Sequence, residues 1–192
     1  DAGCFSFYPG KNLGAYGEGG AVTTNNPEIA RTVRMLRDWG AERRYHHQLK
    51  GYNFRLEGMQ GAVLRVKMNY IEAWTESRRT AAAYYDSMLA GSGINTPHTC
   101  AENRHVYHIY AIRDRQRDAL QSFLHDHSIS TGIHYPIPVH LQPAFAELGY
   151  KAGDFPHSEA AADEELSLPM FPELQPAQQD QVVAALTAWQ HQ

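Results

Sequence analysis

Lys11 is the residue whose surroundings most directly suggest chemistry. It follows Pro9 and Gly10 and precedes Gly14, in a short segment between two strand-like stretches. A lysine that attacks a carbonyl carbon must be held still, and its amine must be neutral to act as a nucleophile. Glycines allow the backbone to approach a bound group closely, and turns direct N–H groups at phosphate. Taken alone, a solvated loop lysine is the more common explanation, because lysine generally prefers the surface.

A longer motif changes that balance. Residues 6–14 read SFYPGKNLG, and residues 17–24 read GEGGAVTT. This pattern closely resembles the active-site signature of the DegT/DnrJ/EryC1/StrS family, whose members are sugar aminotransferases with the aspartate aminotransferase fold. The resemblance implies that Lys11 forms the Schiff base with pyridoxal 5'-phosphate (PLP). It also implies that Ser6 binds the PLP phosphate.

The resemblance continues in order along nearly the whole chain. Residues 37–40 read RDWG, where the family usually has Arg-Asp-His-Gly, and residues 51–56 read GYNFRL. The segments QGAVLRVK (60–67) and GIHYPIPVH (132–140) follow in the family's order. The resemblance implies that Asn53 reaches the PLP phosphate of the neighbouring subunit, which an amide NH2 can do without adding charge. By itself, Asn53 would be interpreted as a turn residue after Gly51.

The lysine at position 11 also separates two activities within the family. Members in which histidine replaces this lysine are sugar dehydratases, so Lys11 favours transamination. The resemblance implies amino-group transfer to a nucleotide-linked keto-sugar, with glutamate as the expected donor, for amino sugars of cell-surface polysaccharides or antibiotics. The lysine would then shuttle a proton as a base, and the cofactor would be the electron sink. A PLP-dependent dehydratase and a non-catalytic fragment are the alternatives.

Several other polar residues are candidate substrate contacts. His134, Tyr135 and His140 lie in a proline-bounded loop, in the region that lies near the nucleotide-sugar pocket in the family, and loops often carry function. The alternative is a rigid proline-rich corner closed by hydrogen-bonded side chains. His47 and Arg55 are further candidates, although Arg55 could equally pair with an acidic residue near the long helix. The eleven histidines show neither HExxH nor a Cys/His zinc spacing, so no metal site is expected.

The elements that must position these residues alternate between strand-like and helical segments. Strands are expected over residues 2–7, 21–24, 106–112 and 129–135, with a short extended stretch over 166–170. A helix is expected from Pro27 to about Gly40 with Asn26 as its N-cap. A long helix is expected over 57–89, and residues 41–56 are expected to form a loop. Further helices are expected after Asp114, between Pro143 and Gly149, and from Pro176.

This alternation indicates an α/β chain. The resemblance refines the class to a PLP-dependent transferase of fold type I. Residues 1–75 would be the C-terminal part of the large PLP-binding domain and residues 76–192 the small C-terminal domain, with the long helix spanning the boundary. In family members, the acidic partner of the pyridine nitrogen and the residue covering the ring precede the lysine strand. Because the chain starts at Asp1, we expect a C-terminal part that is incomplete as an enzyme.

Composition sets the remaining limits. The 192 residues are 43% hydrophobic and 20% charged, with a net charge of -4, so nothing favours nucleic acid or an anionic membrane as a partner. No apolar run approaches the ~20 residues that span a bilayer. Two cysteines are too few for a disulfide framework, which predicts a cytoplasmic protein. A homodimer with a shared active site is expected, because Asn53 would act in the partner's site.

Overall fold

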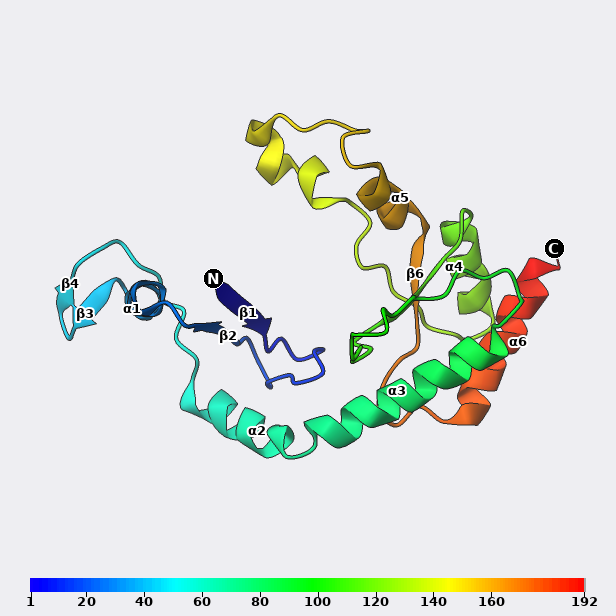
Figure 1. The fold of residues 1–192 in the computed structure, drawn as a ribbon, viewed down its shortest axis with the longest axis horizontal. Coiled ribbons are helices and arrows are strands. Elements are labelled where there is room, and N and C mark those ends of the chain that lie inside the picture. Colours follow the sequence, from blue (N-terminus) through cyan, green and yellow to red (C-terminus); the bar gives the residue numbers. More distant parts are fainter. Residues whose placement is uncertain (192) are drawn as a thin grey trace. The chain divides into compact units, whose positions relative to one another are not determined.

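The computed structural model describes residues 1–191, and the chain divides into two compact units, Asp1–Ala73 and Trp74–Gln192 (Figure 1). The predicted boundary between a large and a small domain, after residue 75, refers to a whole enzyme. It therefore remains a prediction. Helices and strands are mixed in both units. No helix among residues 1–191 is long and apolar enough to cross a membrane.

The first unit begins with a two-stranded antiparallel pair. β1 (Ala2–Ser6) pairs with β2 (Gly20–Thr24), with Ser6 opposite Gly20. Both strands were predicted from the sequence. Residues 7–19 connect the two strands, so Lys11 lies in the connection of a hairpin rather than on a strand.

α1 (Pro27–Leu36) follows β2 directly. The Asn26 side-chain oxygen accepts from the backbone N–H groups of Glu28 (2.9 Å) and Ile29 (3.3 Å), which confirms the predicted N-cap. The helix ends at Leu36, earlier than predicted. Gly40 has a φ of 76° and donates its N–H to the carbonyl of Met35, so it terminates the turn beyond the helix.

The prediction of a loop over residues 41–56 was partly wrong. β3 (Ala41–Arg43) and β4 (His46–His47) form a short antiparallel pair there. These strands are rich in charged residues and histidine and lack apolar alternation, which is the signal that identifies strands in a sequence.

The long helix predicted over residues 57–89 is two helices, α2 (Gly58–Met68) and α3 (Ile71–Met88). The N–H groups of Asn69 and Tyr70 donate to carbonyls three residues back, those of Val66 and Lys67. The Asn69 side chain also reaches the Arg65 carbonyl at 3.5 Å. Asparagine competes for backbone acceptors in this way, and the tightened turn interrupts the helical hydrogen-bond ladder.

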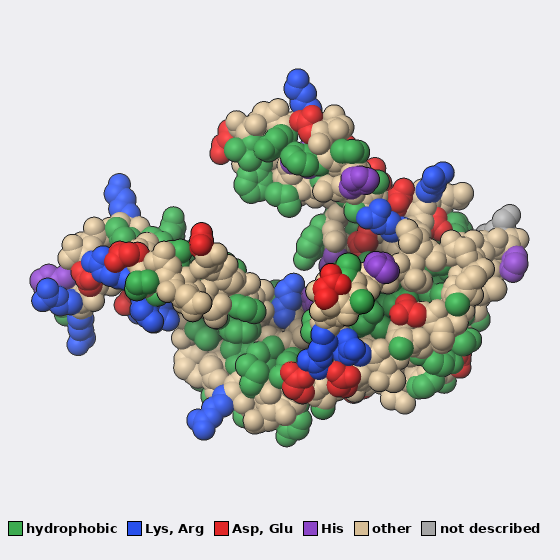
Figure 2. Space-filling view, in the orientation of Figure 1, with side chains coloured by type: hydrophobic (Ala, Val, Ile, Leu, Met, Phe, Trp, Pro, Cys, Tyr) green, Lys and Arg blue, Asp and Glu red, His purple; other side chains and the backbone are tan. Residues whose placement is uncertain are grey.

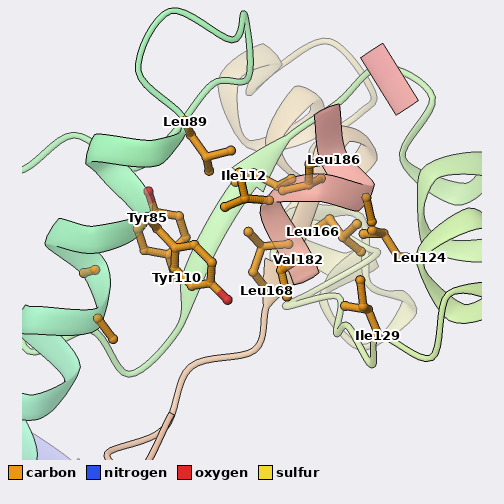
Figure 3. Packing of buried hydrophobic residues seen from close by; sticks show 14 of the residues in the cluster. Tyr85, Leu89, Tyr110, Ile112, Leu124, Ile129, Leu166, Leu168, Val182 and Leu186 are labelled. Atoms are coloured by element: carbon orange, nitrogen blue, oxygen red, sulfur yellow. The ribbon is translucent and has the colours of Figure 1, made fainter. Parts of the chain in front are cut away.

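The second unit is built around a two-stranded antiparallel sheet, β5 (Tyr110–Arg113) and β6 (Glu165–Leu168), in which Ile112 lies opposite Leu166. The helices α3, α4 (Arg117–Asp126) and α6 (Pro176–Gln190) supply buried side chains to the same core. Figure 3 shows Tyr85 beside Tyr110, with Ile112 and Leu186 in the same core. The remaining elements are the short 3-10 helices η1 (Val139–Leu141) and η2 (Pro143–Leu148), and α5 (Pro156–Glu164).

Two predicted strands in this unit need correction. The strand expected over 106–112 is confined to β5. The strand expected over 129–135 does not form: only Gly132 pairs with β6, through Ser167. The next backbone donor on the sheet side, the His134 N–H, bonds to the Glu165 side chain instead of a strand carbonyl, at 2.7 Å. Pro136 and Pro138 then lack an N–H, so the pairing cannot continue.

A buried arginine holds the end of this sheet in place. The Arg78 side chain donates through Nη1 to the carbonyls of Tyr107 (3.1 Å), His108 (3.3 Å) and Met170 (2.8 Å). Burial lowers the pKa of Arg78 below its ordinary value. Because three carbonyls from two distant segments share one donor, Arg78 fastens those segments to α3.

Arg78→Met is therefore expected to destabilise the second unit by about 2–3 kcal/mol, because buried carbonyls would lose their donor. Chemical denaturation followed by circular dichroism measures the change. The control is Arg79→Met, which removes a partly exposed side chain that pairs with Glu76 and donates to the exposed His105 carbonyl and should change stability by less than about 1 kcal/mol. Equal effects of the two substitutions would show that the three-carbonyl contact is unimportant.

Candidate active site

The connection that carries Lys11 is held by its own backbone. The N–H of Phe7 donates to the Gly19 carbonyl at 2.8 Å, and the N–H of Ala15 donates to the Phe7 carbonyl at 2.8 Å. Within this frame, the N–H of Lys11 donates to the Tyr8 carbonyl at 2.9 Å. Lys11 is half-buried. The lysine thus sits in a closed turn instead of a freely moving loop.

Gly14 makes this turn possible. A Cβ atom at position 14 would lie 2.3 Å from the Pro9 carbonyl oxygen and 2.9 Å from that of Tyr8. Those are backbone atoms, so no side-chain movement could relieve the overlap. The absence of a side chain allows the chain to fold back on the two residues that precede Gly10 and Lys11.

Ser6 ends β1 at the same end of the hairpin. Its Oγ accepts from the N–H of Tyr8 at 3.3 Å, which leaves the hydroxyl hydrogen for another acceptor. Across the hairpin, a Cβ at Gly17 would lie 2.9 Å from Gln60 Nε2, and one at Gly19 would lie 2.8 Å from Leu56 Cδ1. The absence of a Cβ at Gly17 and Gly19 therefore lets the side chains of Gln60 and Leu56 pack directly against the backbone.

Two residues of α2 fasten the turn, and neither role was predicted from the sequence. Gln60 Oε1 accepts from the N–H of Tyr16 at 2.8 Å. Lys67 Nζ donates to the Gly14 carbonyl at 2.7 Å and lies 4.7 Å from the centre of the Tyr16 ring. The only sequence signal was their seven-residue spacing, which places both on one face of a helix.

Lys67→Met should loosen this turn, because it removes the donor to Gly14 and the cation over Tyr16 while keeping an apolar side chain of similar length. We expect a loss of about 1 kcal/mol in cofactor binding, or roughly fivefold weaker PLP affinity. PLP titration of the complete gene product measures it. Arg65→Met, on the exposed part of α2, is the control. Unchanged PLP affinity in Lys67→Met would mean that α2 does not support the turn.

A groove of about 640 Å³ lies between the glycine stretch and the segment that precedes α2. It is lined by Gly17–Gly20, Asn53–Glu57, Met59 and Gln60. Of the predicted site residues, the groove brings together Asn53 and Arg55, and Lys11 is not among its lining residues.

Asn53 and Arg55 contact each other directly. Arg55 Nε donates to Asn53 Oδ1 at 2.9 Å and lies 3.8 Å from Asp38 Oδ1. Asp38 and Asn53 also form a backbone bridge. The acidic neighbour of Arg55 is therefore Asp38, which follows α1. The alternative prediction, an acidic partner near the long helix, is not what the structure has. Since Asn53 accepts through its oxygen, its NH2 group can donate to a separate acceptor.

The fifth predicted residue of the first unit, His47, lies on β4. Its Nδ1 donates to the Trp39 carbonyl at 2.9 Å, and the residue is exposed. His47 does not line the groove. The structure therefore gives His47 a backbone contact and does not join it to Asn53 and Arg55.

The three predicted residues of the second unit are held by side-chain hydrogen bonds. His134 Nδ1 lies 2.9 Å from Ser167 Oγ, and the ring of Tyr135, 67% exposed, meets the His134 ring edge-on. His140 Nε2 lies 3.1 Å from Glu159 Oε1, with 9% of its side chain exposed. This is the proline-rich corner closed by hydrogen bonds that the sequence offered as the alternative, and it leaves His140 little surface for a substrate.

The Glu159 carboxylate binds two backbone N–H groups in addition to His140. Its carboxylate also accepts from the backbone N–H groups of Gly153 (2.8 Å) and Phe155 (3.2 Å). Hydrogen bonds from Gly153, and then from Phe155 and His140, hold the pKa of Glu159 below its ordinary value.

Within residues 1–191, no three His, Cys, Asp or Glu side chains are grouped so that they could hold a metal ion.

The fold of this chain is also found in solved structures of other proteins. It matches the crystal structure of DesV from S. venezuelae in complex with a ketimine intermediate, with a TM-score of 0.92 and 44% identity, over 100% of this chain and 52% of that one. NtdA from Bacillus subtilis with bound cofactor PMP matches with a TM-score of 0.87 and 27% identity, over 100% and 46%. These matches confirm the predicted fold class.

The chain belongs to the DegT/DnrJ/EryC1/StrS aminotransferase family, whose model matches residues 1–187. It is 49% identical to the "pleiotropic regulatory protein" of Geobacillus stearothermophilus, over 95% of this chain and 50% of that protein. It is 45% identical to the dTDP-3-amino-3,4,6-trideoxy-alpha-D-glucose transaminase of Streptomyces venezuelae, over 96% and 49%. The chain spans about half the length of these curated relatives, and the predicted family is confirmed.

Proposed function

We propose that this chain is the lysine-bearing part of a PLP-dependent aminotransferase that transfers an amino group to a nucleotide-linked keto-sugar. Glutamate is the proposed donor. The observation that carries the proposal is the Lys11 turn, closed by the backbone approach at Gly14 and fastened to α2. Membership of the family and the similarity to a dTDP-sugar transaminase support the same chemistry.

The residues around the hairpin fit PLP. Lys11 would hold the cofactor covalently, and the Ser6 hydroxyl, whose oxygen already accepts from Tyr8, would donate to the phosphate. Gly17 and Gly19 let Gln60 and Leu56 pack against the glycine stretch, and all four residues line the groove beside the hairpin. When bound, PLP supplies an electron sink that stabilises negative charge on the reacting carbon.

Lys11 then acts as the base of the reaction. A neutral amine can accept a proton from one carbon and return it to another, and the closed turn restricts the lysine to a short path between them. The half-buried setting of Lys11 limits its contact with water. Limited contact with water favours transfer of the proton within the site.

A homodimer with a shared site is part of the proposal, because Asn53 would donate its NH2 group to the phosphate held by the partner subunit. The residues beside it support an interface: the rings of Tyr52 and Phe54 stack at 4.9 Å and are 55% and 71% exposed. Exposed hydrophobic side chains of this unit are visible in green in Figure 2. Apolar patches of this kind mark protein contacts.

Arg55, His47, His134 and Tyr135 are the proposed contacts to the sugar nucleotide, whereas the predicted contact at His140 is not proposed, because its bond to Glu159 leaves only 9% of the side chain exposed. Arg55 is the strongest of them in the first unit, because it lines the groove and 59% of its side chain is exposed. A guanidinium can bind phosphate through two parallel hydrogen bonds.

A cytoplasmic location is also proposed, in keeping with the free thiols of Cys4 and Cys100.

A half-reaction tests this function. The complete gene product, loaded with PLP, should lose the absorbance of the lysine-bound cofactor when glutamate is added, and should release one equivalent of 2-oxoglutarate. A dTDP- or UDP-linked keto-sugar should restore the absorbance. Loss of water from the sugar without consumption of glutamate would identify a dehydratase instead. A protein that takes up no PLP would be the non-catalytic alternative.

A further inference from the structure

A buried carboxylate on β6 is connected to His134 by two routes. Glu165 Oε2 accepts from the backbone N–H of His134 at 2.7 Å, and Glu165 Oε1 lies 2.5 Å from Ser167 Oγ. Ser167 Oγ in turn lies 2.9 Å from His134 Nδ1. Glu165 and Ser167 are only 8% and 5% exposed. A buried carboxylate is costly unless its oxygens are satisfied, and here each of them has a donor.

The chemistry of these groups fixes the direction of each hydrogen bond. A carboxylate can only accept, so the single hydrogen of the Ser167 hydroxyl points to Glu165. Ser167 Oγ can then only accept from the imidazole, so the hydrogen of the neutral ring is on Nδ1. Nε2 of His134 is consequently left with a lone pair, as an acceptor.

The His134 ring lies against the main chain at Gly132. A Cβ at Gly132 would lie 2.7 Å from Cε1 of His134, so the glycine accepts the ring against the main chain. Two hydrogen bonds between the backbones of Gly132 and Ser167, at 3.0 and 2.7 Å, fix that main chain to β6. His134 is nevertheless exposed, and within residues 1–191 its ring is hydrogen-bonded through Nδ1 and not through Nε2.

We propose that Glu165 and Ser167 are positioning residues that hold neutral His134 with its hydrogen on Nδ1, so that Nε2 accepts a hydrogen bond from a hydroxyl group of the sugar substrate. The substrate part of this inference rests on the proposed function. Its chemistry is specific: a hydroxyl can donate to Nε2, whereas a phosphate oxygen without a hydrogen cannot. Neither Glu165 nor Ser167 needs to touch the substrate.

Glu165→Gln tests the positioning directly, because it should reverse the hydrogen bonds while keeping the shape of the side chain. The amide oxygen must face the His134 N–H, since an NH2 group there would oppose another donor. The amide NH2 then faces Ser167 and donates to its Oγ. The serine hydrogen is released toward Nδ1, and the hydrogen of the neutral ring moves to Nε2.

The position of this hydrogen can be measured without any activity assay. The complete gene product is labelled with 15N-histidine, and long-range 1H–15N correlation spectra at a pH where the ring is neutral distinguish Nδ1–H from Nε2–H. His134→Asn identifies the His134 signals by their loss. We expect Nδ1–H in the wild type and Nε2–H in Glu165→Gln. A wild-type ring with its hydrogen on Nε2 would overturn the inference.

Kinetics test the substrate part. Glu165→Gln should raise KM for the keto-sugar by about 5-fold, because Nε2 becomes a donor and the sugar hydroxyl, which must turn to accept from it, loses the acceptor of its own hydrogen, and should leave the half-reaction with glutamate unchanged. Glu164→Gln is the matched control, since its carboxylate lies 4.0 Å from Arg113 and contacts neither Ser167 nor His134. His134→Asn is a second variant: its amide can still donate to Ser167, but it has no equivalent of Nε2, so the same rise in KM is expected.

The outcomes separate the two claims. A reversed hydrogen position with an unchanged KM in both variants would refute the hydroxyl contact. Absence of the glutamate half-reaction in the wild type would refute the proposed function, and the hydroxyl contact with it, while the spectra would still decide the positioning role. If Glu165→Gln does not fold, the wild-type spectra still decide whether the ring hydrogen is on Nδ1, and KM of His134→Asn still decides the substrate contact.

Discussion

Lys11→Ala is expected to slow amino-group transfer by about a thousandfold or more, because the site loses the base that moves the proton. The same change should abolish the absorbance of the lysine-bound cofactor. Lys11→Arg should fail similarly, since a guanidinium stays protonated and cannot act as a base. Single-turnover measurements with glutamate, using the complete gene product, give the rate. Lys50→Ala, which removes an exposed lysine, is the control and should keep the wild-type rate.

The expected loss is chemical and not structural. Lys11 takes part in the turn through its backbone N–H, which alanine retains. Circular dichroism and the melting temperature should therefore match those of the wild type. A folded Lys11→Ala protein with a rate within tenfold of the wild type would exclude Lys11 as the base.

Gly14→Ala is the second prediction with a large expected effect. The new Cβ would lie 2.3 Å from the Pro9 carbonyl oxygen, so the backbone of the turn must move. Forced shifts of this kind cost about 1–3 kcal/mol. The movement would also disturb the Gly14 carbonyl that accepts from Lys67. We expect lower stability together with a PLP affinity reduced by about 10-fold or more.

Gly10→Ala is the matched control for stability, because it lies in the same turn. A Cβ at Gly10 would lie 3.6 Å from the Tyr8 ring, an ordinary contact distance. Thermal denaturation of the two variants should separate them by several degrees. Equal stabilities would contradict the close approach at Gly14, whatever the effect on PLP.

The lysine hairpin could be predicted from the sequence because its signals are local. The two strand-like stretches, the glycines between them and the motif around Lys11 lie within 24 residues. The Asn26 cap was equally predictable, since an asparagine before a proline specifies a helix start through contacts within three residues. Family resemblance added the fold class, which no local pattern specifies.

The errors have physical causes that local patterns do not contain. The break between α2 and α3 depends on one asparagine side chain that reaches back to a carbonyl. The strand expected over 129–135 has suitable residues, but its pairing with β6 stops where Glu165 takes the His134 N–H. Both outcomes depend on a single side chain competing with the backbone for a hydrogen bond.

The contacts that support the candidate site could not be predicted from the sequence either. Lys67 meets Gly14 across 53 positions, and Ser167 meets His134 across 33. Nothing in the spacing of these residues indicates that they meet. The fold brings them together, and this explains why the sequence indicated Lys11 and His134 as candidates but not the residues that hold them.

The most direct test of the central claim is to identify the lysine that binds the cofactor. The chain has four lysines, Lys11, Lys50, Lys67 and Lys151. The PLP-loaded complete gene product is reduced with borohydride, digested, and analysed by mass spectrometry. The account predicts the phosphopyridoxyl group on the peptide that contains Lys11. Its presence on another lysine, or on none, would contradict the account.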